Sequence, residues 1–528
     1  MVAGDDEDRH IRIGVAYDPG QLQAVHLRHF NVCDQQIKFN GYGFDVSLYD
    51  GTACVQEMSS SFDVVSSWRK STRYGFLSDF YTSETGRHQD VEKLNKLHLN
   101  LIQFYDWMYK HDELVGPESE YTDLMGRKLS LDVVKEKVAA CHRYGMKAMA
   151  YGAVYAASQS FYESRKDWAL YDSNGNVLDF IDIFYMMNVA EESPWHDHII
   201  GEYRKTIEQV DFDGIHMDTY GTPKTAISKW GGEEKVVKLE EHFPALINHT
   251  REALEQVKED IALIFNNVGN WPVDTVAVAE QDAMYIEVWN PYERYHHIQQ
   301  IIAWARHFSQ DKPVILAAYL KPFRLEAMEK AEISALLLTA AITSNGGYHL
   351  LLGEDNAVLT QGYYVDYSLV GEPFMRTMRN YYDFIIRYAN LFFDASLRDV
   401  SMTHAKGDNQ EYQLTGAAFS TYGEADKVWT IIREKRGRKV VSLVNLVGNL
   451  DDRWNEGKDE PARIELVEMR IQVEEQVKDV YMASPDEEMG RPQPVPYELV
   501  ESDKGMVVVA QIPNLYIWKL LVIELGAK

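Results

Sequence analysis

Cysteine is scarce in this sequence. The 528 residues contain only Cys33, Cys54 and Cys141, and none of them belongs to a Cys-x-x-Cys pair. At most one disulfide could form, between Cys33 and Cys54. We expect free thiols instead. These counts exclude a disulfide-stapled scaffold, a cysteine-based zinc site and a thiol redox motif.

Positive charge is also in short supply. The sequence has 53 Lys and Arg against 81 Asp and Glu, which gives a formal net charge of −28. Such a surface repels phosphate backbones and anionic lipids, so we expect neither nucleic acid nor a membrane surface as a partner. A neutral ligand meets no such repulsion. No apolar run reaches the roughly 18 residues that a transmembrane helix requires.

The N-terminal sequence has no leader signature. MVAGDDEDRHIRIG lacks both a basic n-region and an apolar h-region, so it does not read as a signal peptide. We expect a cytoplasmic protein if Met1 is the native start, and an extracellular one if a leader was removed. The sequence leaves both alternatives open, and it leaves the oligomeric state unknown.

Three successive patterns divide the chain. Residues 1–70 contain short β-type runs between turn residues and predict an N-terminal β-sandwich-like module. Residues 71–390 alternate short apolar runs with amphipathic stretches whose apolar residues recur at i, i+3 and i+4. Residues 391–528 lose the helical period and predict a C-terminal antiparallel β-sandwich. In that region we interpret the acidic segment 451–463 as a solvated turn.

The middle region predicts a (β/α)8 barrel, and the fold class is therefore multidomain α/β plus β. Eight apolar runs alternate with helical stretches over about 310 residues, as expected of such a barrel. We see no long insertion between them. The predicted strands lie at 99–107, 146–155, 183–188, 212–221, 262–271, 283–289, 313–320 and 347–354.

Working residues of such a barrel lie at the carboxyl ends of its strands. At these ends the sequence is rich in aromatic, amide and carboxylate side chains, and it has no Gly-rich phosphate loop or Lys/Arg cluster. This mixture suits sugar rings, whose flat faces stack and whose hydroxyls need polar partners. We predict as substrate-binding residues Asp106, Trp107, Tyr151, Asn188, His216, Asn267, Trp289, Tyr319, His349 and Glu354; the same ends also carry Tyr155, Asn266, Trp271 and Asp355. For Glu354 the alternative is that it orders the last loop.

Two carboxylates stand out among these residues. Asp218 ends the predicted fourth strand in GIHMDTYG, where it shares a strand face with His216. Glu287 ends the predicted sixth strand in MYIEVWN. Two strands apart, both side chains can point into one cleft. Glycoside hydrolysis needs such a pair, one as nucleophile or base and one as proton donor. A helix cap or an ion pair is the alternative role.

Short motifs with possible metal ligands do not predict a metal site. WHDH (195–198) falls in a predicted helix and HH (296–297) begins another. DSNGN (172–176) has its glycine in the wrong place for a calcium loop and predicts a turn. We therefore expect neither a metal nor any other cofactor.

Five long segments resemble glycoside hydrolase family 66, the dextranases and cycloisomaltooligosaccharide glucanotransferases. They occur in the family's order and run from the end of the N-terminal module through the barrel. The segments are DVVSSWRKSTRYGFLSDF (63–80), LNLIQFYDWMYKHD (99–112), FDGIHMDTYG (212–221), MYIEVWNPYERYHHIQQIIAWARHFSQDKPVILAAYL (284–320) and GGYHLLLGEDNAVLTQGYY (346–364).

The resemblance implies a function and two catalytic roles. Asp218 would be the nucleophile and Glu287 the general acid/base of a retaining hydrolase that attacks α-1,6-linked glucan within the chain. We therefore expect an endo-dextranase whose partners are dextran and isomaltooligosaccharides. Two alternatives stay open: a cyclising glucanotransferase, which the apparent lack of a long insertion disfavours, and a non-catalytic glucan-binding protein.

Overall fold

The computed structural model describes residues 25–28, 40–50, 53–309, 311–404 and 411–526. The chain forms two compact units. One comprises Thr72–Glu372 together with Arg453–Asp459, and we call it the barrel unit. The other comprises the chain up to Ser71 with Pro373–Asp452 and Glu460–Lys528, and we call it the β unit. The three-part division at residues 70 and 390 stays a prediction.

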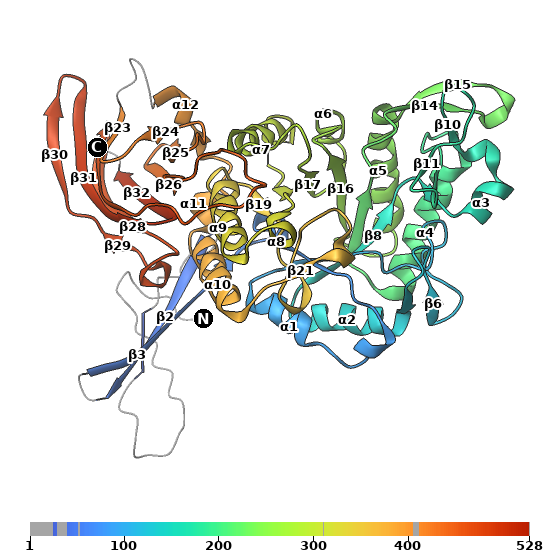
Figure 1. Cartoon of the computed structure of the whole chain (residues 1–528), viewed down its shortest axis with the longest axis horizontal. Coiled ribbons are helices and arrows are strands. Elements are labelled where there is room, and N and C mark those ends of the chain that lie inside the picture. The colour runs from blue at the N-terminus through green and yellow to red at the C-terminus, as the bar shows by residue number, and fades with distance from the viewer. Residues whose placement is uncertain (1–24, 29–39, 51–52, 310, 405–410, 527–528) are drawn as a thin grey trace. The chain divides into compact units, whose positions relative to one another are not determined.

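The barrel unit is built on an eight-stranded parallel sheet (Figure 1). An isolated parallel bridge between Phe76 and Gly353 joins the first strand to the segment that follows the last one. The sheet is therefore a nearly closed barrel, which confirms the predicted (β/α)8 fold. In sheet order the strands are β4 (Tyr74–Leu77), β5 (Leu101–Phe104), β8 (Lys147–Ala153), β13 (Gly214–Asp218), β16 (Ala262–Val268), β17 (Ala283–Glu287), β18 (Val314–Ala317) and β19 (Tyr348–His349).

One strand prediction was wrong and one barrel strand was missed, so the strands from the fourth onward keep their predicted numbers. The first barrel strand is β4, whose four residues we had not singled out. The predicted strand at 183–188 contains β12 (Phe184–Met186), which belongs to a small antiparallel sheet outside the barrel. Asp218 and Glu287 consequently still end the fourth and sixth barrel strands.

Helices connect the barrel strands, and local capping explains several of their starts. The Ser130 side chain accepts a hydrogen bond from Val133 N, and Ser193 accepts one from Trp195 N with Pro194 at the first turn. The helix that Ser193 caps ends at Val210, and the next residue, Asp211, has φ of 69°. The longer helices are α1 (Gln89–Lys96), α2 (Leu131–Arg143), α4 (Pro194–Val210), α5 (Leu239–Glu255), α7 (Tyr295–Ser309) and α9 (Met328–Ser344); the short ones are α3 (Gln159–Ser164), α6 (Val273–Val276) and α8 (Pro322–Leu325).

The connections after the third and fourth barrel strands hold small sheets of their own. Our expectation that the eight strands follow one another without a long insertion is therefore corrected. One sheet has the order β11-β12-β9 and the other β10-β14-β15. Their remaining strands are β9 (Ala156–Ala157), β10 (Leu170–Tyr171), β11 (Asp179–Phe180), β14 (Thr225–Ser228) and β15 (Lys235–Lys238); short pairs elsewhere are β6 (Glu120–Thr122) with β7 (Lys128–Ser130) and β20 (Ala357–Val358) with β21 (Ser368–Leu369).

The β unit contains the predicted C-terminal sandwich. Two antiparallel-rich sheets share one apolar core, to which Val441 and Leu521 contribute from one sheet and Val467 and Val508 from the other. The larger sheet holds β22 (Arg398–Asp399), β24 (Phe419–Ser420), β25 (Val428–Lys435), β26 (Arg438–Asn445), β28 (Gln476–Ala483), β29 (Gln493–Pro494) and β32 (Trp518–Gly526); the smaller holds β23 (Tyr412–Thr415), β27 (Ile464–Val473), β30 (Tyr497–Ser502) and β31 (Gly505–Leu515).

An N-terminal three-stranded sheet also belongs to the β unit. It consists of β1 (Val25–Arg28), β2 (Asn40–Asp50) and β3 (Ala53–Val64) in an antiparallel arrangement. The unit's helices are α10 (Glu372–Arg387), which begins at the border between the units, α11 (Ala389–Phe392) and α12 (Ser401–His404). Buried Arg387 donates to Asp45 Oδ1 at 2.7 Å, which fastens α10 to β2.

The acidic segment 451–463 is not the solvated turn that we expected. Its residues Arg453–Asp459 form part of the barrel unit. Trp454 is buried, and its indole donates to Tyr292 O at 2.7 Å. Lys321 pairs with Glu456 at 2.8 Å. A tryptophan inside a charged segment therefore signals an anchored loop.

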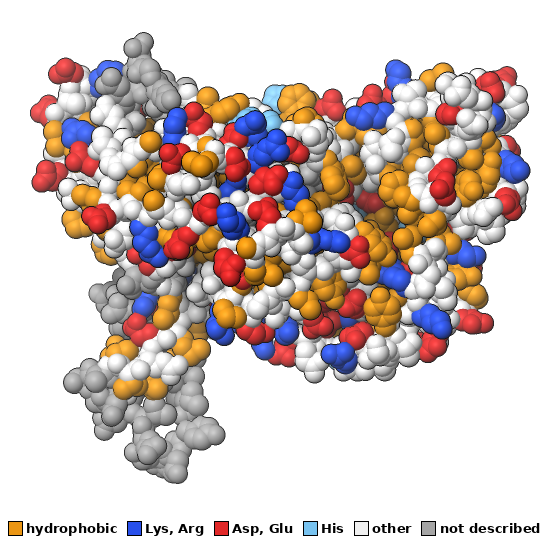
Figure 2. All heavy atoms as spheres, in the orientation of Figure 1, with side chains coloured by type: hydrophobic (Ala, Val, Ile, Leu, Met, Phe, Trp, Pro, Cys, Tyr) orange, Lys and Arg blue, Asp and Glu red, His pale blue; other side chains and the backbone are white. Residues whose placement is uncertain are grey.

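The structure also shows the state of the cysteines, the character of the helices and the distribution of surface charge. Among the described residues Cys54 is exposed and Cys141 buried, and both are free; Cys33 lies outside the described residues. None of the described helices combines the length and apolarity needed to cross a bilayer. On the face shown in Figure 2, acidic and basic side chains are interspersed.

Candidate active site

Asp218 and Glu287 lie at the carboxyl end of the barrel. Asp218 is the last residue of β13 and is 7% exposed, and Glu287 is the last residue of β17. Parallel pairing aligns Asp218 with Ala153 on β8, and Glu287 with Val268 on β16. The strand register therefore brings both carboxylates to one edge of the sheet.

Asp218 accepts two short hydrogen bonds. The Tyr151 hydroxyl donates to Asp218 Oδ2 at 2.6 Å, and the Asn266 amide donates to Oδ1 at 2.6 Å. Tyr151 comes from β8 and Asn266 from β16, the two neighbours of β13 in the sheet. Both carboxylate oxygens are thus held in place by the adjacent strands.

Glu287 is held in a similar way. The Tyr319 hydroxyl donates to Glu287 Oε1 at 2.8 Å, and the Trp289 indole donates to Oε2 at 2.8 Å. Tyr319 follows β18 and is buried, whereas Trp289 is 41% exposed. Trp289 therefore orients the carboxylate and also presents an aromatic surface to solvent.

The two carboxylates influence each other's protonation. Burial raises the pKa of Asp218 to about 8, and the neighbouring Glu287 charge adds to this rise. Burial also raises the pKa of Glu287, while the hydrogen bonds from Trp289 and Tyr319 act to lower it, as does Asn266. Because like charges resist simultaneous ionisation, the pair keeps one proton near neutral pH.

Asp106 adds a third buried carboxylate to the region. It follows β5 with φ of 48°, a left-handed conformation that aspartate tolerates. Burial raises its pKa to about 7, although Arg127 acts in the opposite direction. Arg127 reaches Asp106 O at 2.5 Å and lies 3.8 Å from Oδ2. The charge of Asp106 also contributes to raising the pKa of Asp218.

His216 and His349 are both kept neutral by burial. The pKa of His216 is lowered to about 3 and that of His349 to about 4. His216 Nδ1 is 2.9 Å from the Tyr74 hydroxyl, and His349 Nδ1 is 3.0 Å from Thr339 Oγ1. His349 Nε2 is buried without a hydrogen-bond partner among the described residues.

A row of four tyrosines connects the two carboxylates. Tyr151, which binds Asp218, contacts Tyr105 with ring centroids 4.9 Å apart. Tyr105 stacks on Tyr364 at 4.4 Å and 15°. The Tyr364 hydroxyl is 3.3 Å from that of Tyr319, which binds Glu287. Burial raises the pKa of each of the four phenols, so they remain neutral donors.

Three predicted ligands are committed to the protein instead. Trp107 is fully buried and donates to Tyr151 O at 3.2 Å. Asn188 lies outside the barrel sheet and donates to Ser228 Oγ at 3.1 Å. Asn267 donates to Phe265 O and Tyr285 O at 3.2 and 2.9 Å. Their role in substrate binding stays a prediction.

Glu354 joins the first and last barrel loops. Its Oε1 accepts hydrogen bonds from Ser78 N at 2.6 Å and Ser78 Oγ at 2.7 Å, and Oε2 accepts one from Asp79 N at 3.2 Å. Lys137 Nζ lies 3.8 Å from Oε2 and 2.5 Å from Asp90. Burial raises the pKa of Glu354 to about 8, against the effect of Lys137. Of the two roles we predicted, these contacts correspond to ordering the last loop.

Three residues near the pair were not among our predicted ligands. One is Asn266, which neighbours the predicted ligand Asn267; strand alternation places only one of these two amides beside Asp218. Tyr105 directly precedes Asp106, and Tyr364 lies in the aromatic segment GYYVDY after β19. The density of tyrosine in these two segments was the available signal.

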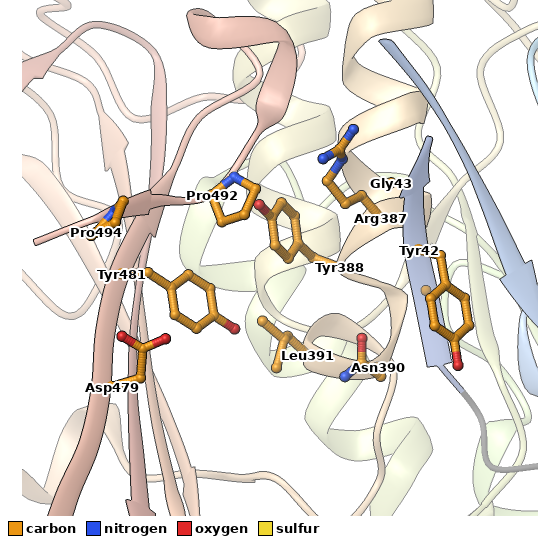
Figure 3. Close-up of a pocket in the computed structure, with 11 residues that line it drawn as sticks. Tyr42, Gly43, Arg387, Tyr388, Asn390, Leu391, Asp479, Tyr481, Pro492 and Pro494 are labelled. Atoms are coloured by element: carbon orange, nitrogen blue, oxygen red, sulfur yellow. The ribbon is translucent and has the colours of Figure 1, made fainter. Parts of the chain in front are cut away.

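A separate cavity lies in the β unit and has a different lining (Figure 3). Its volume is about 560 Å³. Tyr42, Tyr388 and Tyr481 line it together with a single carboxylate, Asp479. A glycosidase needs two carboxylates, so this cavity does not offer that chemistry. Within the described part of the chain, no three or more His, Cys, Asp or Glu side chains are grouped so as to hold a metal ion.

Comparisons with known proteins point to one family. The model of glycosyl hydrolase family 66 matches residues 21–522. A cycloisomaltooligosaccharide glucanotransferase from Niallia circulans is 22% identical over 630 aligned residues, which include 91% of this chain and 64% of the relative. A dextranase from Streptococcus salivarius is 23% identical over 568 residues, with 92% and 67% covered. The chain thus spans less than two thirds of the length of the first relative.

A solved structure has the same fold. A Paenibacillus sp. cycloisomaltooligosaccharide glucanotransferase, crystallised with cycloisomaltoheptaose, superposes with a TM-score of 0.84. The sequences are 21% identical, and the match covers 92% of this chain and 89% of that chain. The likeness extends over both units of the chain.

Proposed function

The chain belongs to glycosyl hydrolase family 66, and from this premise we propose that it is an endo-dextranase. It hydrolyses internal α-1,6-glucosidic linkages of dextran and isomaltooligosaccharides with retention of configuration. The observation that carries the proposal is the pair of carboxylates, Asp218 and Glu287, that the strand register brings to the carboxyl end of the barrel.

Each carboxylate has a separate role in the proposed reaction. Glu287 protonates the glucosidic oxygen while Asp218 attacks the anomeric carbon, so the bond to the leaving chain breaks and a glucosyl–Asp218 ester forms. Glu287 then takes a proton from water, whose oxygen displaces Asp218. A retaining reaction requires the two carboxyl groups to lie about 5–5.5 Å apart, rather than the roughly 6.5–9.5 Å of an inverting pair.

The surrounding side chains support a neutral sugar as the substrate. Trp289 presents an exposed aromatic face beside Glu287. Tyr151 and Tyr319 hold the carboxylates as neutral donors. Flat aromatic faces and neutral polar groups suit pyranose rings and their hydroxyls.

A cyclising glucanotransferase is the second candidate within the family. Two compared relatives with that activity in their names support it, one of them by its structure. The alignment with the Niallia circulans relative spans 630 residues, whereas this chain has 528. The alignment with the dextranase spans 568 residues and exceeds the chain by less. The relative therefore contains segments that this sequence lacks, which favours hydrolysis here.

Digestion of dextran followed by chromatography tests the proposal. Linear isomaltooligosaccharides and a rapid fall in polymer length support an endo-dextranase, and cyclic products support the transferase. Binding of dextran without release of reducing ends over a day supports a non-catalytic glucan-binding protein. Parallel digests of α-1,4 and α-1,3 glucans test the linkage, and Asp218→Asn provides the inactive control.

A further inference from the structure

The hairpin between β11 and β12 carries two exposed apolar side chains at its tip. Phe180 is 38% exposed and Ile181 is 52% exposed. Ile181 has φ of 55°, a left-handed conformation that is unfavourable for a β-branched residue. Asp179 Oδ1 accepts a hydrogen bond from Asp182 N at 2.8 Å, which holds the turn in this shape. Exposed apolar groups on a strained turn are a feature of binding sites.

This tip lies next to the catalytic loop of β13. The Phe180 ring stacks on Tyr220, with centroids 4.5 Å apart and an interplanar angle of 24°. Tyr220 is two residues after Asp218, so their Cα atoms are separated by at most about 7 Å. Asp218 is also, after burial, a cause of the raised pKa of Tyr220. The stack therefore stands close to the nucleophile of the proposed reaction.

Tyr220 itself is firmly positioned. Its backbone N–H donates to the Tyr155 hydroxyl, which in turn donates to Thr222 O at 3.1 Å. The rings of Tyr155 and Tyr220 meet edge to face at 5.4 Å. The Tyr220 hydroxyl is buried and makes no hydrogen bond of good geometry with the described residues, although Tyr151 is near enough to act on its pKa.

We propose that Phe180, supported by Tyr220, is a stacking platform for a glucosyl unit of the substrate beyond the one that is cleaved. The proposal rests on the proposed function, which supplies the sugar chain. Tyr220 covers one face of the Phe180 ring, and the exposure of Phe180 leaves surface for a pyranose ring.

A platform of this kind determines which chain lengths are good substrates. A short substrate that occupies only the catalytic pair gains nothing from Phe180, whereas a longer chain gains one stacked sugar. Replacing Phe180 should therefore weaken the binding of long chains and leave the binding of short chains unchanged. A purely structural role for Phe180 would affect substrates of every length alike.

The test compares Phe180→Ala, Phe180→Tyr and Phe180→Leu on dextran and on isomaltooligosaccharides of increasing length. We expect Phe180→Ala to raise KM for dextran and the longer oligosaccharides by about threefold to tenfold, with kcat unchanged. The shortest substrate should be unaffected. Phe180→Tyr keeps a stacking face and should resemble the wild type, whereas Phe180→Leu should resemble Phe180→Ala. Trp304→Ala is the matched control, an exposed aromatic residue on α7.

Several outcomes would overturn the platform. They are a Leu variant equal to the wild type, an equal loss on the shortest substrate, and the same loss in Trp304→Ala. If the wild type cleaves no α-1,6-glucan, the proposed function fails separately. Calorimetric titration with isomaltoheptaose in an Asp218→Asn background then decides the platform, because Phe180→Ala must weaken binding relative to that background.

Discussion

Asn266 Nδ2 lies 2.6 Å from Asp218 Oδ1, and the same side chain acts against the rise in the pKa of Glu287. A neutral donor between two acids stabilises whichever of them is ionised. Because Asn266 is fully buried on β16, its amide has no water to compete for these contacts. It therefore helps the pair to hold one charge and one proton.

Replacing Asn266 by Ala should lower kcat more than it changes KM. A hydrogen bond to a charged group contributes about 1.5–3 kcal/mol, which corresponds to a loss of about 10- to 100-fold in rate. Steady-state kinetics on dextran measure the effect. Asn267→Ala is the control, because that side chain binds Phe265 O and Tyr285 O. It should lower stability and leave kcat of the folded enzyme unchanged; a larger loss of kcat in Asn267→Ala would contradict this assignment.

Asp218→Gly tests the nucleophile directly. The variant should lose about 10⁴-fold in kcat on dextran, since no covalent intermediate can form. Azide added with an activated aryl α-glucoside should restore turnover and give β-glucosyl azide, because the small anion attacks from the face that the carboxylate has vacated. Nuclear magnetic resonance of the product identifies its configuration. An α-azide would mean that Asp218 is not the nucleophile.

The pH profile should report the shared proton. Activity should fall above about pH 8, because loss of the last proton from the pair leaves no acid, and the pKa of Asp218 is raised to about 8. Glu287→Gln removes the neighbouring charge, so the pKa of Asp218 should fall. On an aryl α-glucoside, whose leaving group needs no protonation, the variant should therefore stay active above pH 8. An unchanged alkaline limb of kcat/KM in the variant would disprove the coupling.

The sequence predicted the barrel and the positions of the two carboxylates because both depend on strong local patterns. Asp218 and Glu287 each end an apolar run, and the period of two places His216 and Asp218 on one strand face. The first barrel strand was missed because β4 has only four residues. The run 183–188 was misassigned because a short apolar segment reads alike in a barrel and in a small added sheet.

The contacts around the pair were less predictable than the pair itself. Choosing between Asn266 and Asn267 requires the phase of β16, which two adjacent amides do not reveal. The role of Asn188 stays a prediction, and β12, which precedes it, is not in the barrel. Tyr364 contacts Tyr105 and Tyr319 in the folded protein, although both partners lie far from it in the sequence. Long-range packing of this kind leaves no local pattern.

Glu354 should matter for stability rather than for chemistry. Its carboxylate accepts three hydrogen bonds from Ser78 and Asp79 and faces Lys137, all in a buried environment. Glu354→Ala leaves these donors unsatisfied and removes a partner of the buried Lys137, which should lower the free energy of unfolding by about 3 kcal/mol. Calorimetric unfolding of the variant should show a lower transition temperature.

Asp355→Asn is the matched control for this prediction. Asp355 is the next residue along, its side chain is 47% exposed, and it lies 3.9 Å from Lys93. An exposed ion pair at that distance contributes little, and asparagine tolerates the left-handed φ of 48° at this position. The control should therefore unfold at the wild-type temperature. If Glu354→Ala also unfolded at the wild-type temperature but raised KM for dextran, Glu354 would be a substrate ligand. Only a contact with the sugar explains a loss of affinity without a loss of stability.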